Sequence, residues 1–276
     1  GEALNAAAAH SGAIASARTA GEQASAAGRH DLRARALGME ARSLARSGDL
    51  AAGFDRAQAG LSLALEQGPP SVAAELYQRL GVVLYNGTDY RRAETTLDTA
   101  LELCRGSDAP DVELETITCL IYVLRESGEW ERAEALAREQ LATGREPWLA
   151  EGLIGAIHGH RGHPAAARRL LLPALATATR TGHYVMVVDT TSALAGIAAA
   201  QGDGGHGDLE SAHACAAALT RIVADSAKPD ALAGVAHAIG EIALADGDAE
   251  RAAGQMMRAL ELHRGLDIPL DRAEIA

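Results

Sequence analysis

Small apolar residues recur along the chain in two series of positions, most of them about 40 residues apart. The first series closes the apolar face of one predicted helix, and the second opens the apolar face of the next helix. Short turn sequences, such as SGDL at 47–50 and DGDA at 246–249, lie between them. The first series is Ala41, Gly81, Ile121 (its one large member), Gly155, Ala195 and Gly240, and the second is Gly53, Ala93, Ala133, Ala167, Ala212 and Ala252.

A repeat of 34 to 45 residues with this pattern predicts a stack of antiparallel helical hairpins. We therefore expect an all-α fold, a right-handed superhelix (α-solenoid) of about six hairpins that forms a single array over residues 1–276. A further helix near 2–27 precedes the first hairpin. The expected units are about 31–68, 71–105, 111–143, 147–181, 183–226 and 229–265.

Turn and capping residues support these boundaries. A carboxylate at the first residue of a helix accepts hydrogen bonds from free backbone N–H groups. The predicted capping residues are Asp49, Asp89, Asp208 and Asp248.

The chain begins without Met in helical sequence, and Pro269 opens a new helix shortly before its end. We therefore expect a segment of a longer protein, with partial repeats at both ends whose exposed faces favour self-association.

Composition narrows the possible functions. The chain is 48% hydrophobic but only 3% aromatic, which favours closely packed helices over a sheet. A net charge of −12 argues against binding to nucleic acid, which needs a basic surface. Lys228 is the only lysine and stands in AKPD, so a phosphate-binding G-x-x-x-x-G-K loop is excluded.

The cysteines and apolar segments indicate the compartment. Cys104, Cys119 and Cys215 are odd in number and widely spaced within helical patterns, which favours reduced thiols. No apolar stretch is long enough to span a bilayer, and no signal peptide precedes the first helix. We expect a cytoplasmic protein without a membrane partner.

The second unit carries a family signature. Its order is an aromatic residue, Leu-Gly, a large apolar residue, a Tyr at the turn and Ala at the close contact. That order resembles the tetratricopeptide repeat, and the third unit repeats it with Ile121 in place of the small residue. The residues are Tyr77, Leu80, Gly81, Leu84, Tyr90, Ala93, Leu97 and Ala100.

The 40-residue rhythm and the segment 259–276 resemble the degenerate repeats of bacterial LuxR-type ATP-binding transcription regulators and related signal-transduction ATPases. In that family the repeats lie between an ATPase and an output domain, where they sense an inducer or hold the ATPase inactive. Neither the ATPase nor a DNA-binding helix-turn-helix is in this sequence.

The resemblance implies that the first helix of each hairpin lines a concave binding surface. In the first three units its register presents polar side chains, whereas the later units present small or apolar ones, such as Leu149, Gly152 and Ala156. The candidate binding residues are Arg35, Arg42, Arg46, Gln78, Tyr85, Asn86, Thr118, Tyr122 and Arg125.

Two features of this surface are open to more than one interpretation. Arg35, Arg42 and Arg46 share one helical face and suit a carboxylate or a phosphate. The alternative is a solvated face whose arginines pair with nearby acids. Tyr85 and Tyr122 could stack on a ligand, but packing between helices explains them equally well.

No catalytic motif is present, and no pattern implies a cofactor. His158, His160 and His163 are close enough in sequence to bind a transition metal, but no Cys or pair of carboxylates completes the set, so we expect no metal site. The Gly-rich segment 202–208 is predicted to be an enlarged turn.

These patterns predict a non-catalytic domain of a cytoplasmic bacterial regulator that binds a protein or peptide, with a small-molecule inducer as a further candidate ligand. A regulator of transcription is the expected parent protein. The alternative is a scaffold that assembles protein complexes and senses nothing. A metal-dependent activity at the three histidines is the third hypothesis.

Overall fold

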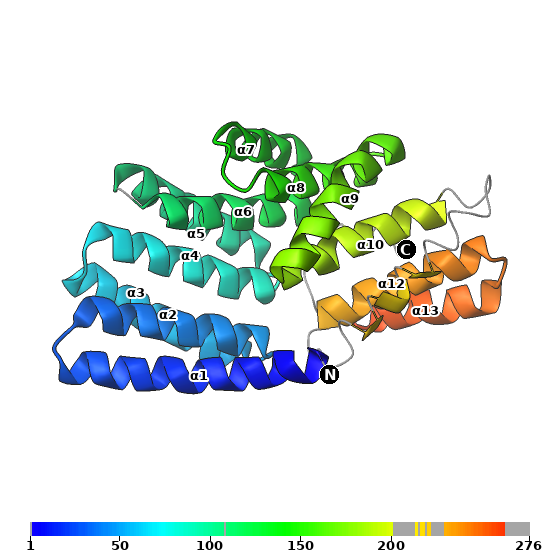
Figure 1. The fold of residues 1–276 in the computed structure, drawn as a ribbon. Coiled ribbons are helices and arrows are strands. Elements are labelled where there is room, and N and C mark those ends of the chain that lie inside the picture. The colour runs from blue at the N-terminus through cyan, green and yellow to red at the C-terminus, as the bar shows by residue number, and fades with distance from the viewer. Residues whose placement is uncertain are drawn as a thin grey trace. The chain divides into compact units, whose positions relative to one another are not determined.

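The computed structural model describes residues 2–107, 109–200, 213–214, 216–218, 220–221 and 229–262. The regular elements of these residues are α-helices that pack against their neighbours as hairpins (Figure 1). The predicted all-α hairpin architecture is confirmed. The helices are α1 (Glu2–Ala26), α2 (His30–Arg46), α3 (Leu50–Gln67), α4 (Pro70–Asn86), α5 (Tyr90–Gly106), α6 (Pro110–Glu126), α7 (Trp130–Ala142), α8 (Pro147–His160), α9 (Pro164–Thr181), α10 (Tyr184–Ala200), α12 (Pro229–Ala245) and α13 (Ala249–Leu262).

The chain divides into two compact units, residues 1–127 and 128–276. The first holds α1 to α6 and the second holds the helices from α7 onward. The boundary falls in the turn after α6, so the predicted hairpin at about 111–143 contributes one helix to each unit. That all hairpins form a single array stays a prediction.

Capping and proline chemistry sets the helix starts. The side chains of Asp49, Asp89 and Asp248 accept hydrogen bonds from backbone N–H groups three residues later, as the sequence predicts. Asp208 and the Gly-rich segment 202–208 lie outside the described residues. Proline occupies the first turn of α4, α6, α8 and α9, where its missing N–H leaves no hydrogen bond unmade.

The small residues of the two series lie where neighbouring helices approach most closely. A Cβ atom at Gly81 would lie 2.6 Å from Leu97 Cγ, and one at Gly155 would lie 2.9 Å from Leu171 Cγ. The large member, Ile121, is fully buried. Ala212 lies outside the described residues. The regular spacing of the small residues in the sequence therefore reflects the positions at which neighbouring helices pack against each other.

Within the first unit, α4 packs against both α2 and α6, so these three helices form one layer. They are the first helices of successive hairpins, and this layer carries all of the predicted binding residues. None of the helices in the described part of the chain is long and apolar enough to cross a membrane.

Candidate functional site

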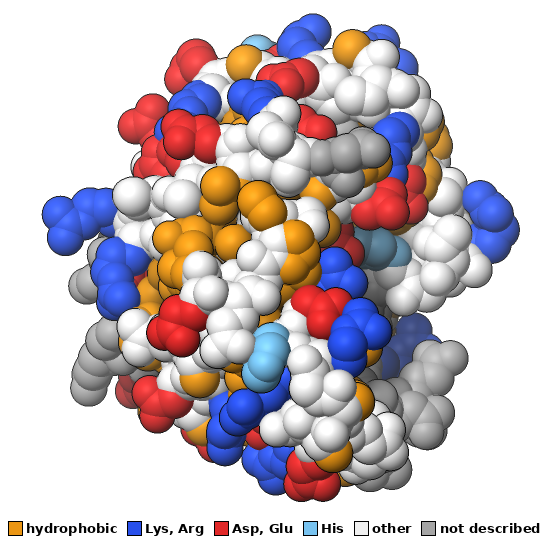
Figure 2. Space-filling view, turned by 90° about the vertical axis from the view of Figure 1, so that its left-hand side faces the viewer, with side chains coloured by type: hydrophobic (Ala, Val, Ile, Leu, Met, Phe, Trp, Pro, Cys, Tyr) orange, Lys and Arg blue, Asp and Glu red, His pale blue; other side chains and the backbone are white. Residues whose placement is uncertain are grey.

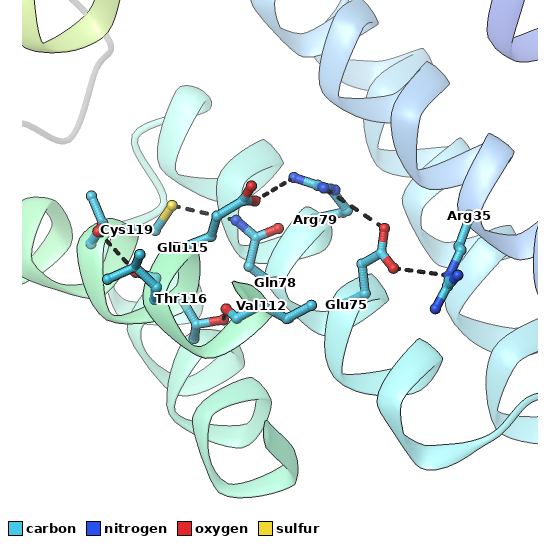
Figure 3. A network of polar contacts seen from close by, with 10 residues as sticks. Arg35, Glu75, Gln78, Arg79, Val112, Glu115, Thr116 and Cys119 are labelled. Carbon is cyan, nitrogen blue, oxygen red and sulfur yellow. Dashed lines mark hydrogen bonds and ion pairs between the residues drawn. The ribbon is translucent and has the colours of Figure 1, made fainter. Parts of the chain in front are cut away.

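A ladder of ion pairs crosses the layer of α2, α4 and α6 (Figure 3). Arg35 Nε lies 3.0 Å from Glu75 Oε2, and the other oxygen of Glu75 lies 3.7 Å from Arg79 Nη2. Arg79 Nη1 in turn lies 3.0 Å from Glu115 Oε2. Each step joins a helix to itself or to the next helix of the layer. Arg35 therefore follows the alternative interpretation, in which an arginine of this face is paired with an acid.

Arg42 and Arg46 differ from Arg35. Neither makes an ion pair or a hydrogen bond with another described residue, and Arg42 Nε is buried without a partner. Burial is the main cause that lowers the pKa of Arg42 below its ordinary value, and the charge of Arg79 lowers it further. Burial also lowers the pKa of Arg46 to about 10, with the charge of Arg42 as the second cause. The charge of Glu115 raises both pKa values and so opposes these effects in part. The two adjacent guanidinium groups are thus partly desolvated, and neither makes an ion pair with a described carboxylate.

Further polar atoms beside these arginines lack partners. Gln78 is only 2% exposed, and its Nε2 lies 3.5 Å from Cys119 Sγ. Gln78 Oε1 and Arg79 Nε are buried and accept or donate no hydrogen bond among the described residues. Burial raises the pKa of the Cys119 thiol, which therefore stays neutral. We call these residues the arginine face: Arg35, Arg42, Arg46, Glu75, Gln78, Arg79, Glu115 and Cys119.

The two predicted tyrosines pack within the protein. The Tyr85 ring lies 6.2 Å from the Tyr122 ring and 5.8 Å from the Tyr90 ring. The Arg125 guanidinium lies over the Tyr122 ring, at 5.1 Å from its centroid, and pairs with Glu126 at 2.7 Å. Packing between helices accounts for these contacts, as the alternative interpretation expects.

The other two candidates use their polar groups within their own helices. Asn86 Nδ2 donates to the Val82 carbonyl at 2.6 Å, and Thr118 Oγ1 donates to the Leu114 carbonyl at 2.9 Å. Such bonds to the preceding turn are common for short polar side chains. These two residues flank the arginine face without adding to its ion-pair ladder.

Sequence reasoning missed Arg79 and Cys119. The register placed Gln78 on the binding surface and left out the next residue, yet Arg79 pairs with Glu75 and Glu115. Arg79 lies four residues after Glu75, a spacing at which opposite charges meet on a helix. That spacing was the available signal.

The three histidines considered as a metal site, His158, His160 and His163, lie at the end of α8 and in the turn after it. His158 Nε2 lies 3.9 Å from Glu134 Oε1, and the His158 and His163 rings are 5.8 Å apart. Glu134 already binds Arg138 and Arg161, and the hydrogen bond from Arg138 is the largest cause that lowers its pKa. His160 stacks on Trp130 instead. In the described part of the chain, no three His, Cys, Asp or Glu side chains gather as a metal site needs.

The small and apolar residues predicted for the later part of the surface serve helix packing where they lie on α8 of the second unit. A Cβ atom at Gly152 would lie 2.9 Å from Met186 Sδ and 3.1 Å from Ala174 Cβ. Leu149 and Ala156 are buried. Because these positions are taken up by packing, the unpaired arginines of the first unit remain the strongest candidate site.

In the view of Figure 2, basic and acidic side chains are interspersed around a group of hydrophobic ones.

The fold defines the chain as an all-α domain of tetratricopeptide-like hairpins. No protein-family model matches it, and no protein with a curated description matches it. Solved structures do. Aspartyl phosphate phosphatase F from Bacillus subtilis is 13% identical, with a TM-score of 0.64 over 86% of this chain and 61% of the phosphatase. The apo form of RapI is 13% identical, with a TM-score of 0.56 over 90% of this chain and 77% of RapI.

A third match is a signal-transduction ATPase. It is the Signal Transduction ATPase with Numerous Domains from Pyrococcus horikoshii, which has a tetratricopeptide repeat sensor. It is 16% identical, with a TM-score of 0.53 over 88% of this chain. The chain spans 38% of that protein and less than two thirds of phosphatase F. These matches support a tetratricopeptide-like domain that resembles the repeats of signal-transduction ATPases.

Proposed function

We propose that this chain is the non-catalytic interaction and sensing domain of a larger cytoplasmic regulator, and that the arginine face binds an anionic group of a partner protein. A bacterial regulator of transcription with an ATPase is the parent protein that the resemblance favours. A small-molecule inducer with a carboxylate would use the same arginines.

The observation that carries the proposal is the state of Arg42 and Arg46. A partly buried guanidinium without a counter-ion destabilises the folded protein, because burial removes water that no protein group replaces. An anionic ligand would supply the missing hydrogen bonds in a setting where charge-assisted bonds are strong. Arg35 and Arg79 already have acidic partners and would hold the layer in place.

Sensing would follow from differential binding. A partner that binds the layer of α2, α4 and α6 more tightly in one arrangement of the parent regulator shifts its population toward that arrangement. The domain needs no chemistry of its own for this role.

The test uses a fluorescent, end-blocked alanine peptide with two adjacent glutamates. We expect fluorescence anisotropy to report saturable binding that weakens as salt is added. The double variant Arg42→Gln, Arg46→Gln should weaken binding by about tenfold or more, because charged hydrogen bonds contribute about 1.5–3 kcal/mol each. Arg33→Gln removes one exposed charge from the same helix and serves as the control. Equal affinities of the double variant and the wild type would contradict the proposal.

A further inference from the structure

The charges of the layer do not balance. The arginine face contains four arginines and only two glutamates: Arg35, Arg42, Arg46 and Arg79 against Glu75 and Glu115. The excess is two positive charges, although the whole chain carries −12. The ion pairs assign this excess to Arg42 and Arg46, which make no ion pair with a described residue, because Glu115 is already paired with Arg79.

The unused hydrogen-bonding groups are mostly donors. Arg42 Nε and Arg79 Nε are buried and donate to no described residue, and the rest of the Arg42 and Arg46 guanidinium groups add further donors. The Gln78 amide can be turned over, so that the Cys119 thiol donates to Oε1 and Nε2 becomes one more donor. A ligand that suits this set carries two negative charges and several acceptor oxygens.

We infer that the anion bound at the arginine face is a phosphoryl group on a phosphorylated side chain of the partner protein. This inference rests on the proposed function. A phosphoryl monoester carries a charge of about −1.5 to −2 at neutral pH and three strong acceptor oxygens. A single carboxylate carries one charge and two oxygens, so it would leave one arginine without a counter-ion. The planar guanidinium fork matches two phosphate oxygens at once.

The first measurement compares two probes of similar charge on the full chain by isothermal titration calorimetry. One is a blocked alanine peptide with a single phosphoserine, and the other is the peptide with two adjacent glutamates. We expect the phosphoserine peptide to bind about tenfold more tightly, because one group presents both charges and all its acceptors to the paired arginines. Arg42→Gln with Arg46→Gln should remove this preference, whereas Arg33→Gln should keep it, with circular dichroism to verify that both variants are folded.

The second measurement uses pH. The second pKa of a phosphate monoester is about 6, so lowering the pH from 7.5 to 5.5 should weaken the phosphoserine peptide about fourfold more than the glutamate peptide. The glutamate peptide, measured over the same range, accounts for titration of the protein itself. Inorganic phosphate is the third probe and should compete only weakly.

The outcomes separate the inference from the proposed function. If the glutamate peptide binds as tightly as the phosphoserine peptide, the phosphoryl inference is wrong and the proposed anion-binding function stands. If inorganic phosphate displaces the probe as effectively as the phosphopeptide does, the ligand is a free phosphate and the protein-borne group is wrong. If no probe binds, both proposals are wrong.

Discussion

Buried polar atoms without partners occur in both compact units, and their surroundings give them different meanings. Arg42 Nε, Gln78 Oε1 and Arg79 Nε are found together with charged neighbours on one face of the first unit. Gln140 in α7 is 1% exposed, and neither its Nε2 nor its Oε1 has a partner among the described residues. Because its neutral amide carries no charge that would attract an ionic ligand, we interpret Gln140 as a packing defect.

Replacing Gln140 should therefore stabilise the protein. At the equivalent position, four other units have a small buried residue: Gly60, Ala100, Ala174 and Ala259. Gln140→Met keeps the length of the side chain and removes both unsatisfied groups, so we expect the free energy of unfolding to rise by about 1 kcal/mol. Urea denaturation measures the change. The exposed Gln67→Met is the control and should stay within about 0.5 kcal/mol of the wild type. A loss of stability in the first variant would show that the amide has a bonding partner.

The turn at Thr88 stores strain. Its backbone φ is 59°, in the left-handed region, where the equivalent turns have Gly48, Gly128, Gly162 and Gly247. A β-branched side chain fits poorly there. We expect Thr88→Gly to raise the free energy of unfolding by about 1 kcal/mol, since relief of the strain outweighs the hydrogen bond of Thr88 Oγ1 to the Gly87 carbonyl. Thermal unfolding checks this, and a lower Tm would contradict it.

At the scale of helices, the fold requires that neighbouring helices approach each other closely at the small residues. Gly81 faces the fully buried Leu97, so an added methyl group would overlap a side chain that has no room to move. We expect Gly81→Ala to lower the free energy of unfolding by about 1–3 kcal/mol, although alanine favours helix by about 1 kcal/mol.

The matched control is Gly254→Ala in α13. A Cβ atom there would meet nothing within 4 Å, so only the helix propensity changes and stability should rise. Chemical denaturation of both variants compares the two effects. Equal changes in the free energy of unfolding of the two variants would mean that a small residue is not required where the helices contact each other.

The sequence predicted this level of structure well because helix periodicity, caps and small contact residues act locally. It could not say which arginines are paired. Arg35 and Arg42 occupy similar positions on α2, and only the packing of α4 beside them decides that Glu75 reaches Arg35 while nothing acidic pairs with Arg42. The pair of Arg79 with Glu75 could have been predicted from their spacing, but its pair with Glu115 depends on the distance between α4 and α6.

At the scale of the whole molecule, the predicted change in surface character coincides with the division into compact units. Every candidate binding residue lies within 1–127, whereas the small and apolar set lies within 128–276. The first unit thus carries the proposed recognition surface, whereas in α8 of the second unit equivalent positions such as Gly152 serve close packing.

A ligand at the arginine face should stabilise the whole chain. Binding to the folded state alone adds about 2.7 kcal/mol at a ligand concentration of 100 times Kd. Removing the unpaired charges should stabilise the free protein as well, because Leu tolerates the burial that a guanidinium does not. Binding and stability therefore oppose each other at Arg42 and Arg46.

Urea unfolding of the wild type and of Arg42→Leu with Arg46→Leu, each with and without the glutamate peptide, tests this account most directly. We predict that the double variant is about 1 kcal/mol or more stable than the wild type without peptide and gains nothing from the peptide. A double variant that is less stable on its own and is still stabilised by the peptide would contradict the assignment of the anion site to these two arginines.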